Sequence, residues 1–281
     1  MSDFPVKAQV PPSVAKLVEA QKKPLLSCKV AASTSEKVLP FSTNLELRER
    51  YINFFGGLRL GKLLEDLDLI AGQVAYKHTK GWERGLTIVT AACDRIDLLG
   101  ELHSDCDLQL LSSINWVGRS SLEVGLRISS KVGKTWRRVA RAYFIMVARR
   151  EGKAELVNSV EPVGRDEQRR FQQGEQRQQQ RRAIAQTSYL HNTPTADESR
   201  VLHDLFLRIK NGEIGGAAME DTIRQSTLLM HPQSRNVHNN IFGGYLMREA
   251  FELAWNITYL FCRKGRSLSA WITCISTSLW K

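Results

Sequence analysis

Two adjacent glycines, Gly243 and Gly244, lie where a polar, asparagine-rich segment gives way to an amphipathic helical pattern. Glycine lets the backbone come very close to whatever lies at the helix start. The first N–H groups of a helix have no partner within the helix and carry partial positive charge, so they suit a polarised carbonyl group or an anion. The alternative interpretation is a loop, a glycine turn and a core helix without chemistry.

An upstream glycine, Gly61, opens a second amphipathic helical pattern. Counting back eight residues from Gly61 reaches Asn53, and the same step back from Gly244 reaches Asn236. Two glycine-led helices, each preceded by an asparagine at the same spacing, indicate a duplicated unit.

The two copies differ chemically after the glycine. Seven residues beyond the glycine, the first copy has Asp68, and the second copy has Phe251 followed by Glu252. Asp68 lies on the shoulder of the apolar stripe of its helix, where partial desolvation would raise the pKa of the carboxyl group and suit it to general-base work. With Glu65 and Asp66, it could instead form the solvent-exposed face of the helix.

Four strand-like stretches follow the first helix. Their apolar residues alternate with polar ones, which predicts an antiparallel sheet with one polar face. A long helix on the apolar face of such a sheet makes an α+β layer. The stretches are residues 86–96, 107–117, 122–128 and 136–148.

Six segments, in order, resemble the hotdog-fold acyl-coenzyme A thioesterases. They are LRERY (47–51), RLGKLLEDLD (59–68), LTIVTAACDRID (86–97), INWVGRSSLEV (114–124), FIMVARR (144–150) and HPQSRNVHNNIFGGYLMREAFELAW (231–255). The resemblance covers roughly residues 47–263. It implies the hotdog fold, a long helix wrapped by an antiparallel sheet, in a tandem double arrangement with an active site between the two units.

The resemblance also implies an activity, the hydrolysis of fatty acyl-coenzyme A to free fatty acid and coenzyme A. Asp68 would activate water, and Asn236 would orient that water or the thioester. Gly61, Gly243 and Gly244 would bind substrate, with helix N–H groups stabilising the oxyanion. Whether Asp68 activates water or attacks directly stays open.

A reciprocal site would pair Asn53 with Phe251 or Glu252. Phe251 cannot transfer a proton, so we expect this second site to be inactive. Ser234 departs from the family, which usually has an acidic residue at that position. The missing acid weakens the case for a well-formed first site.

The sequence divides into five expected segments. They are an extended or disordered leader (1–46), a first hotdog domain (47–160), a Gln/Arg-rich connector with one amphipathic helix (161–225), the start of a truncated second hotdog domain (226–265) and a tail unlike the family (266–281).

The second hotdog unit is expected to be incomplete. Only about eighteen residues follow its helix, whereas the first unit uses roughly seventy to supply its strands. An alternative function follows from this expectation. The chain would be a catalytically inactive, truncated product that binds acyl-coenzyme A or a full-length relative.

The Gln/Arg-rich segment has two interpretations, an RNA-contacting basic helix or a solvated connector. No aromatic side chains alternate with its arginines to stack bases, which favours the connector. Thr195 and Glu198 then have the spacing of a capping box. They lead a helix that we expect to pack against a hotdog unit.

The chain of 281 residues is basic, with a formal net charge of +11. A basic surface fits nucleic acid, an anionic membrane or a phosphate-bearing small molecule such as coenzyme A. The five cysteines show no metal-ligand spacing. We therefore expect no metal and no cofactor. The apolar runs are too short to span a membrane, and we expect no nucleic-acid partner. The resemblance implies an acyl-coenzyme A substrate and a homo-oligomer of hotdog units.

The resemblance implies a mitochondrial location. The leader has no arginine before Arg48 and an acid at Asp3, so it is a poor mitochondrial presequence on its own. A cytoplasmic location is the alternative.

Overall fold

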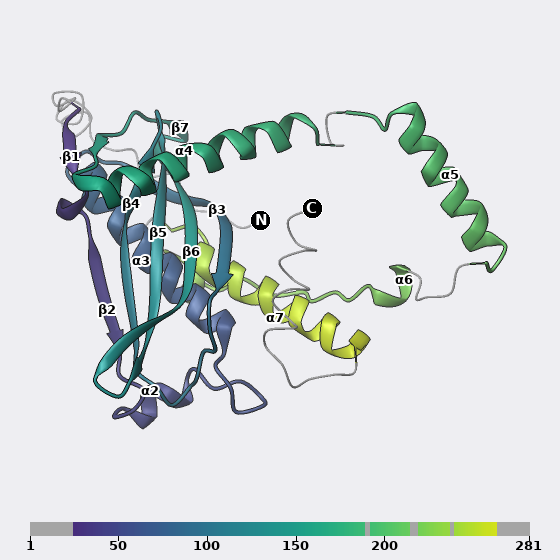
Figure 1. Cartoon of the computed structure of the whole chain (residues 1–281), viewed down its shortest axis with the longest axis horizontal. Coiled ribbons are helices and arrows are strands. Elements are labelled where there is room, and N and C mark those ends of the chain that lie inside the picture. Colours follow the sequence, from purple (N-terminus) through teal and green to yellow (C-terminus); the bar gives the residue numbers. More distant parts are fainter. Residues whose placement is uncertain (1–24, 189–191, 214–218, 237–238, 263–281) are drawn as a thin grey trace, which may run out of the picture.

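The computed structural model describes residues 25–188, 192–213, 219–236 and 239–262 (Figure 1). In chain order the elements are β1 (Ser27–Lys29), the 3-10 helix η1 (Val30–Ala32), β2 (Ser35–Leu39), α2 (Leu45–Glu49), α3 (Leu60–Thr79), β3 (Thr87–Leu98), β4 (Leu108–Val117), β5 (Ser121–Val132), β6 (Thr135–Arg150), β7 (Lys153–Ala154), β8 (Ser159–Glu161), α4 (Gly164–Gln186), α5 (Ala196–Lys210), α6 (Met219–Thr222), the 3-10 helix η2 (Pro232–Ser234) and α7 (Gly243–Cys262).

One antiparallel sheet forms the body of the protein. Its strands run in the order β2-β4-β5-β6-β3, with the short β7 paired to β6. The four strand-like stretches predicted from the sequence are β3 to β6, so that prediction is confirmed. In Figure 1, α3 lies behind the sheet and α4 lies in front of it.

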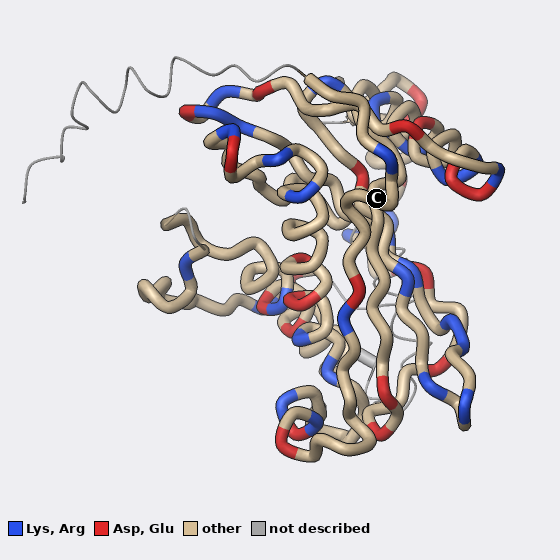
Figure 2. Tube along the Cα trace, turned by 90° about the vertical axis from the view of Figure 1, so that its left-hand side faces the viewer, with Lys and Arg blue, Asp and Glu red and all other residues tan. Residues whose placement is uncertain are grey.

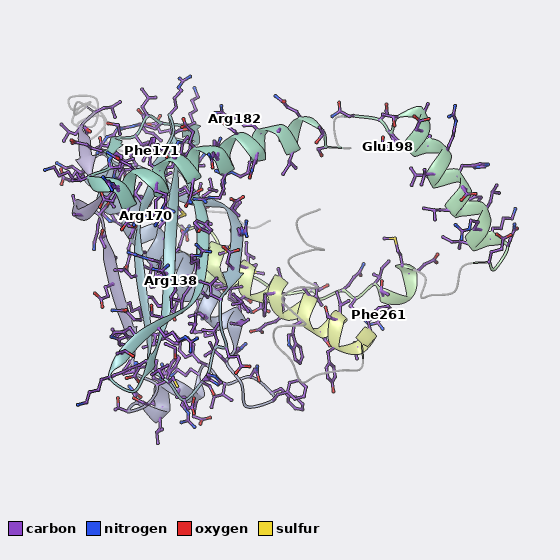
Figure 3. All side chains as sticks on the ribbon, viewed as in Figure 1. Arg138, Arg170, Phe171, Arg182, Glu198 and Phe261 are labelled. Atoms are coloured by element: carbon purple, nitrogen blue, oxygen red, sulfur yellow. The ribbon has the colours of Figure 1, made fainter. Side chains whose placement is uncertain are left out.

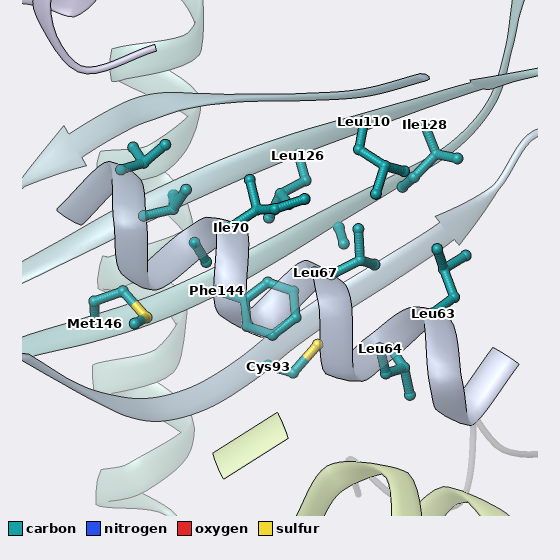
Figure 4. Close-up of a cluster of buried hydrophobic side chains, with 14 of the residues drawn as sticks. Leu63, Leu64, Leu67, Ile70, Cys93, Leu110, Leu126, Ile128, Phe144 and Met146 are labelled. Atoms are coloured by element: carbon teal, nitrogen blue, oxygen red, sulfur yellow. The ribbon is translucent and has the colours of Figure 1, made fainter. Parts of the chain in front are cut away.

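The core lies between α3 and the inner face of the sheet. Leu63, Leu67 and Ile70 of α3 are at most 3% exposed and meet strand residues such as Leu126 and Phe144 (Figure 4). The helix contributes these residues at intervals of three and four, and each strand contributes every second residue. Burying each such side chain contributes about 1.5–3 kcal/mol, so this layer is a main source of stability.

Residues 25–46 belong to the fold, which corrects the prediction of a leader with little role in the core. β2 pairs with β4, and Leu39 and Phe41 are 2% and 0% exposed. The period-two pattern of β2 is only five residues long and ends at Pro40, so it is too brief to stand out in the sequence. Residues 1–24 lie outside the described residues.

The Gln/Arg-rich segment is also packed more closely than a solvated connector. It forms α4, which lies on the outer face of the sheet so tightly that a Cβ at Gly174 would be 2.6 Å from the Cβ of Trp116. Glu123 of β5 is 0% exposed and accepts hydrogen bonds from Arg177 of α4 at 2.6 and 3.0 Å. The partner of this arginine is 54 positions away in sequence, so composition alone could not reveal the docking.

The capping box predicted for the next helix is confirmed, since Thr195 and Glu198 bond reciprocally at the start of α5. The expected packing of α5 against a hotdog unit is wrong in the part of the chain that the structure describes. Val201 and Phe206 on its apolar side are each 60% exposed, and α5 lies away from the sheet in Figure 1. An amphipathic pattern predicts an apolar face but does not name what covers it.

The helix predicted after Gly243 is confirmed as α7, which packs against α3. The start of each helix lies beside the middle of the other, because Gly61 approaches Glu252 and Gly243 approaches Asp68. The two helices are therefore antiparallel. The tail at 266–281 lies outside the described residues, and the truncation of the second unit stays a prediction.

Candidate active site

The loops that precede α3 and α7 are built alike. The N–H of Asn53 donates to the carbonyl of Gly57 at 2.8 Å, and the N–H of Asn236 donates to the carbonyl of Asn240 at 2.7 Å. In return, each asparagine Oδ1 accepts from the N–H of that same partner, at 3.1 and 3.2 Å. An isolated antiparallel bridge closes each loop. The shared hydrogen bonds support the duplicated unit inferred from the sequence.

The two glycines at the start of α7 allow it to lie against α3. A Cβ at Gly243 would lie 3.3 Å from Oδ2 of Asp68, and a Cβ at Gly244 would lie 3.0 Å from the carbonyl oxygen of Glu65. Both distances are tighter than most real Cβ contacts, so a larger residue at either position would have to displace its neighbour. The glycines therefore favour the close approach that the sequence predicted.

Asp68 lies in this contact and is 3% exposed. The hydroxyl of Thr90 on β3 donates to its Oδ1 at 2.6 Å, and the backbone of Gly244 also bonds to the carboxylate. Burial raises the pKa of Asp68 above its ordinary 3.8, and the bonds from Thr90 and Gly244 offset part of that rise. A desolvated carboxylate of this kind is a stronger base than one in water.

The three neighbouring carboxylates of α3 have different partners. Glu65 forms an ion pair with Arg248 at 2.9 Å, and Asp66 forms one with Lys37 at 3.1 Å. Asp66 also accepts a hydrogen bond from the hydroxyl of Tyr51. Among the described residues, Asp68 has no ion-pair partner. Because Asp66 and Asp68 are both buried, the interpretation of this cluster as a solvent-exposed face is wrong.

Asn236 lies on the loop that leads into α7. Its Oδ1 accepts from the N–H of Asn240, which is the turn role that asparagine often has. The hydrogen bonds of the Asp68 carboxylate come from Thr90 and Gly244, so Asn236 is not one of its partners. A role for Asn236 toward water or substrate stays a prediction.

Gly61 lies at the opposite end of the helix pair. A Cβ there would lie 2.9 Å from Oε1 of Glu252, and Arg59 donates to the two oxygens of Glu252 at 2.7 and 3.0 Å. Phe251 and Trp255 line a cavity of about 330 Å³ beside this ion pair. The structure thus places Gly61 apart from Asp68, Gly243 and Gly244.

A larger cavity of about 860 Å³ lies between α3, β3 and α7. Thr90 and Gly243, which both lie close to Asp68, line this cavity. The rest of its lining is mainly apolar. Such a volume is within the range of small-molecule sites. Its apolar lining includes Leu60, Leu63, Leu64, Leu67, Ile96, Leu98, Leu102, Ile128, Leu246, Met247 and Phe251.

Sequence reasoning did not single out Thr90. The residue lies two positions after Ile88, which is 6% exposed, so the alternation of β3 puts both on the inner face. A polar residue in an apolar row of a strand was the available signal.

The described residues contain no group of three or more His, Cys, Asp or Glu side chains that could hold a metal ion. None of the described helices is long and apolar enough to cross a membrane.

Comparison with known proteins gives relatives in sequence and in fold, although no family model matches. The chain is 35% identical to mitochondrial acyl-coenzyme A thioesterase 9 of Homo sapiens over 237 residues, which are 78% of this chain and 54% of that protein. It is 33% identical to mitochondrial acyl-coenzyme A thioesterase 4 of Humulus lupulus over 269 residues, 89% of this chain and 49% of that protein. The chain thus spans about half the length of the curated relatives it matches.

Two solved structures share the fold. An acyl-CoA hydrolase from Staphylococcus aureus, solved with butyryl coenzyme A and coenzyme A, matches with 25% identity and a TM-score of 0.50 over 57% of this chain and 92% of that one. An acyl-CoA hydrolase from Bacillus cereus matches with 23% identity and a TM-score of 0.50 over 60% and 99%. The long helix α3 wrapped by an antiparallel sheet is the hotdog fold. By sequence and by fold, the chain is a homologue of the hotdog-fold acyl-coenzyme A thioesterases.

Proposed function

We propose that the chain hydrolyses fatty acyl-coenzyme A thioesters to a free fatty acid and coenzyme A. The observation that carries the proposal is Asp68, a buried carboxylate that has no cationic partner among the described residues and is held against the glycine-led start of α7. The sequence relatives bear acyl-coenzyme A thioesterase names, and the hydrolase from Staphylococcus aureus was solved with coenzyme A ligands.

In the proposed reaction, Asp68 takes a proton from a water molecule as that water attacks the thioester carbonyl. Thr90 holds the carboxylate in place through its 2.6 Å hydrogen bond. The carbonyl oxygen becomes an oxyanion, which free N–H groups at the glycine-led start of α7 would stabilise, with Gly243 as the candidate donor because the backbone of Gly244 already bonds to Asp68. The carbon–sulfur bond then breaks, and the thiolate of coenzyme A leaves and takes up a proton. Asn236 would orient the water or the thioester.

The acyl chain would occupy the 860 Å³ cavity between α3, β3 and α7. Its apolar lining suits a hydrocarbon chain, and its lining residues Thr90 and Gly243 lie beside Asp68. Burial of the chain would contribute about 0.8 kcal/mol for each methylene group. A longer acyl group should therefore be bound more tightly than an acetyl group.

We also propose a mitochondrial location and assembly into oligomers. The location is supported by the names of the sequence relatives. Assembly is supported by β3, which is an edge strand of the sheet, and by apolar residues of α7 such as Leu260 and Phe261, which are 47% and 60% exposed. Exposed strand edges and apolar patches are surfaces that other subunits cover.

The test is the release of free thiol by the purified chain from acyl-coenzyme A esters of short to long chain length. We expect Asp68→Asn to lower kcat/KM by about 10²- to 10⁴-fold, the usual contribution of a general base. Glu252→Gln, at the other end of the helix pair, should change it less than about twofold. Circular dichroism would establish that each variant is folded.

A folded wild-type chain that releases no thiol from any ester would overturn the proposal. Binding of acyl-coenzyme A by such a chain, measured by calorimetry, would favour the alternative of a catalytically inactive product. Equal loss in Asp68→Asn and Glu252→Gln would remove Asp68 from its role as base.

A further inference from the structure

The cavity between α3, β3 and α7 extends along β3. Thr90, which bonds to Asp68, lines it near the start of that strand, and Leu98 lines it at the end. In the register of β3 and β6, Met146 is opposite Thr90. Six positions further back in β6, Ala140 is opposite Leu98. Because a strand rises about 3.3 Å per residue, about 20 Å separates the two ends of the cavity.

Four apolar residues line the cavity at the end far from Asp68. Ala140 of β6 is opposite Leu98 of β3 on one side and Ile128 of β5 on the other, and all three line the cavity. Leu102, in the loop after β3, lines it as well. Ala140, Ile128 and Leu102 are 2%, 1% and 7% exposed. In Figure 4, Ile128 lies on the opposite side of the buried cluster from Met146. We call Leu98, Leu102, Ile128 and Ala140 the floor of the cavity.

The floor is apolar, although charged residues are spread along most of the chain (Figure 2). The charged residues that line the cavity are Asp94, Arg95 and Asp97, which all belong to β3. Arg95 lies 2.5 Å from Asp97, and Asp94 lies 2.6 Å from Arg181 of α4. A hydrocarbon chain in the cavity would therefore meet neutralised charges along one strand and only apolar side chains at the floor.

The first half of α7 closes the cavity on the side away from the sheet. The lining residues of that helix run from Gly243 to Phe251. Phe261, near the other end of α7, lies away from the sheet (Figure 3) and is 60% exposed. This exposed apolar side chain can therefore be compared with the buried ones of the floor.

Resting on the hydrolysis proposed above, which puts the thioester carbon beside Asp68, we propose that the floor makes the chain selective for long acyl groups and that Ala140 sets their upper length. Each bond of an extended chain advances about 1.2 Å, as in an extended peptide, so an acyl group of about 16 carbons reaches the floor about 20 Å away. Each methylene that enters the cavity should tighten binding by up to about fourfold until the chain meets the floor. Ala140 has the smallest side chain of the floor, so a larger residue there would shorten the cavity most.

The test is titration calorimetry with butyryl-, octanoyl-, palmitoyl- and arachidoyl-coenzyme A, below the concentrations at which they form micelles. Asp68→Asn is the parent protein, so that no ester is consumed during the titration. Its affinity should rise from butyryl to palmitoyl and stop rising from palmitoyl to arachidoyl. Ala140→Leu, added to this parent, should lower the ratio of palmitoyl to octanoyl affinity by about tenfold or more, because the last methylenes no longer fit. Ala140→Val should lower the ratio less, and it supplies the answer should the leucine variant not fold.

Two matched controls separate the floor from general effects on packing. Ala142→Val overpacks the same strand, since Ala142 is 0% exposed, but Ala142 is not among the residues that line the cavity. The ratio should stay within about twofold of the parent value in this variant. Leu102→Ala deepens the floor and should raise the affinity for arachidoyl-coenzyme A relative to palmitoyl-coenzyme A. Phe261→Ala removes an apolar side chain outside the cavity and should leave that comparison unchanged.

Equal ratios in Ala140→Val, Ala142→Val and the parent would overturn the role of Ala140, as would an equal fall of the ratio in both valine variants. Tightest binding of butyryl-coenzyme A, or no binding of any ester, would overturn the selectivity for long acyl groups. Thiol release by the wild type then tells the two proposals apart. A shift of the chain-length limit in Ala140→Val without any thiol release would support the floor and overturn the hydrolysis. Thiol release that does not depend on chain length would support the hydrolysis and overturn the floor.

Discussion

The two ends of the α3–α7 pair differ although their backbones are alike. At each end the start of one helix meets a carboxylate from the middle of the other. Asp68 meets the start of α7 and has no ion pair within the described part of the chain, whereas Glu252 meets the start of α3 while paired with Arg59 at 2.7 Å. The two similar frames therefore hold a desolvated carboxylate at one end and an ion pair at the other.

The repeat shows which positions make this difference. Gly61 and Gly244 are 183 positions apart, and the same offset aligns Arg59 with Phe242. It likewise aligns Glu252 with Leu69. Neither member of the ion pair therefore has a counterpart at the Asp68 end, and among the described residues no cation lowers the pKa of Asp68. In the proposed function, the basicity of Asp68 depends on the absent arginine as much as on the aspartate.

Apart from Asp68→Asn, the variant Thr90→Val should lower kcat/KM the most. The variant removes the 2.6 Å hydrogen bond to Asp68, and a bond to a charged group is worth about 10- to 100-fold in kcat/KM. That bond lowers the pKa of Asp68, so its loss should move the acid limb of the pH–rate profile to higher pH. The measurement is thiol release as a function of pH.

Thr87→Val is the matched control, because Thr87 is a partly exposed residue of the same strand. An acid limb that stays in place in Thr90→Val would mean that the threonine does not act on the base.

Sequence periodicity predicted those helices and strands that bury one face over many residues. Alternation gave β3 to β6, and helical spacing gave α3 and α7, because one buried face imposes each pattern over many residues. The spacing of Gly61, Gly244 and their asparagines also predicted a duplication, which the similar loop hydrogen bonds support. The resemblance to the thioesterases and the repeat singled out Asp68, and its position on the shoulder of an apolar stripe predicted the burial that the structure shows.

Features that depend on distant partners escaped prediction. The docking of α4 needs Arg177 to meet Glu123, and the packing of residues 25–46 needs β2 to meet β4. Thr90 becomes informative only once β3 is known to place it beside Asp68. Contacts of this kind leave no periodic signal in the sequence, so they appear only in the folded chain.

The burial of the Asp68 carboxylate should also affect the stability of the folded protein. Burial raises its pKa in the folded protein above the ordinary 3.8, so over that range the native state holds a proton that the unfolded state has lost. Stability contributed by this group is therefore present below pH 3.8 and is lost as pH rises through the raised pKa. Asp68→Asn, which stays neutral, should unfold at a higher temperature than the wild type at pH 7.

The advantage of Asp68→Asn should shrink as pH falls toward 3.8, because the wild-type carboxyl then becomes neutral as well. Thermal unfolding between pH 3 and pH 8 would measure it. A lower unfolding temperature for the variant at pH 7 would mean that the charged carboxylate stabilises the fold and is not held at a cost.

The smallest effect on activity and stability should come from the Arg59–Glu252 ion pair at the other end of the helix pair. The side chains of Arg59 and Glu252 are 39% and 33% exposed, so water screens their attraction. A double-mutant cycle with Arg59→Gln and Glu252→Gln should give a coupling energy of about 0.5–1 kcal/mol by urea unfolding, as for other partly exposed ion pairs. Thiol release should hardly change in either variant, because neither residue meets Asp68. A coupling above about 2 kcal/mol would mean that this pair is as desolvated as Asp68, and the contrast between the two ends would then rest on the arginine alone.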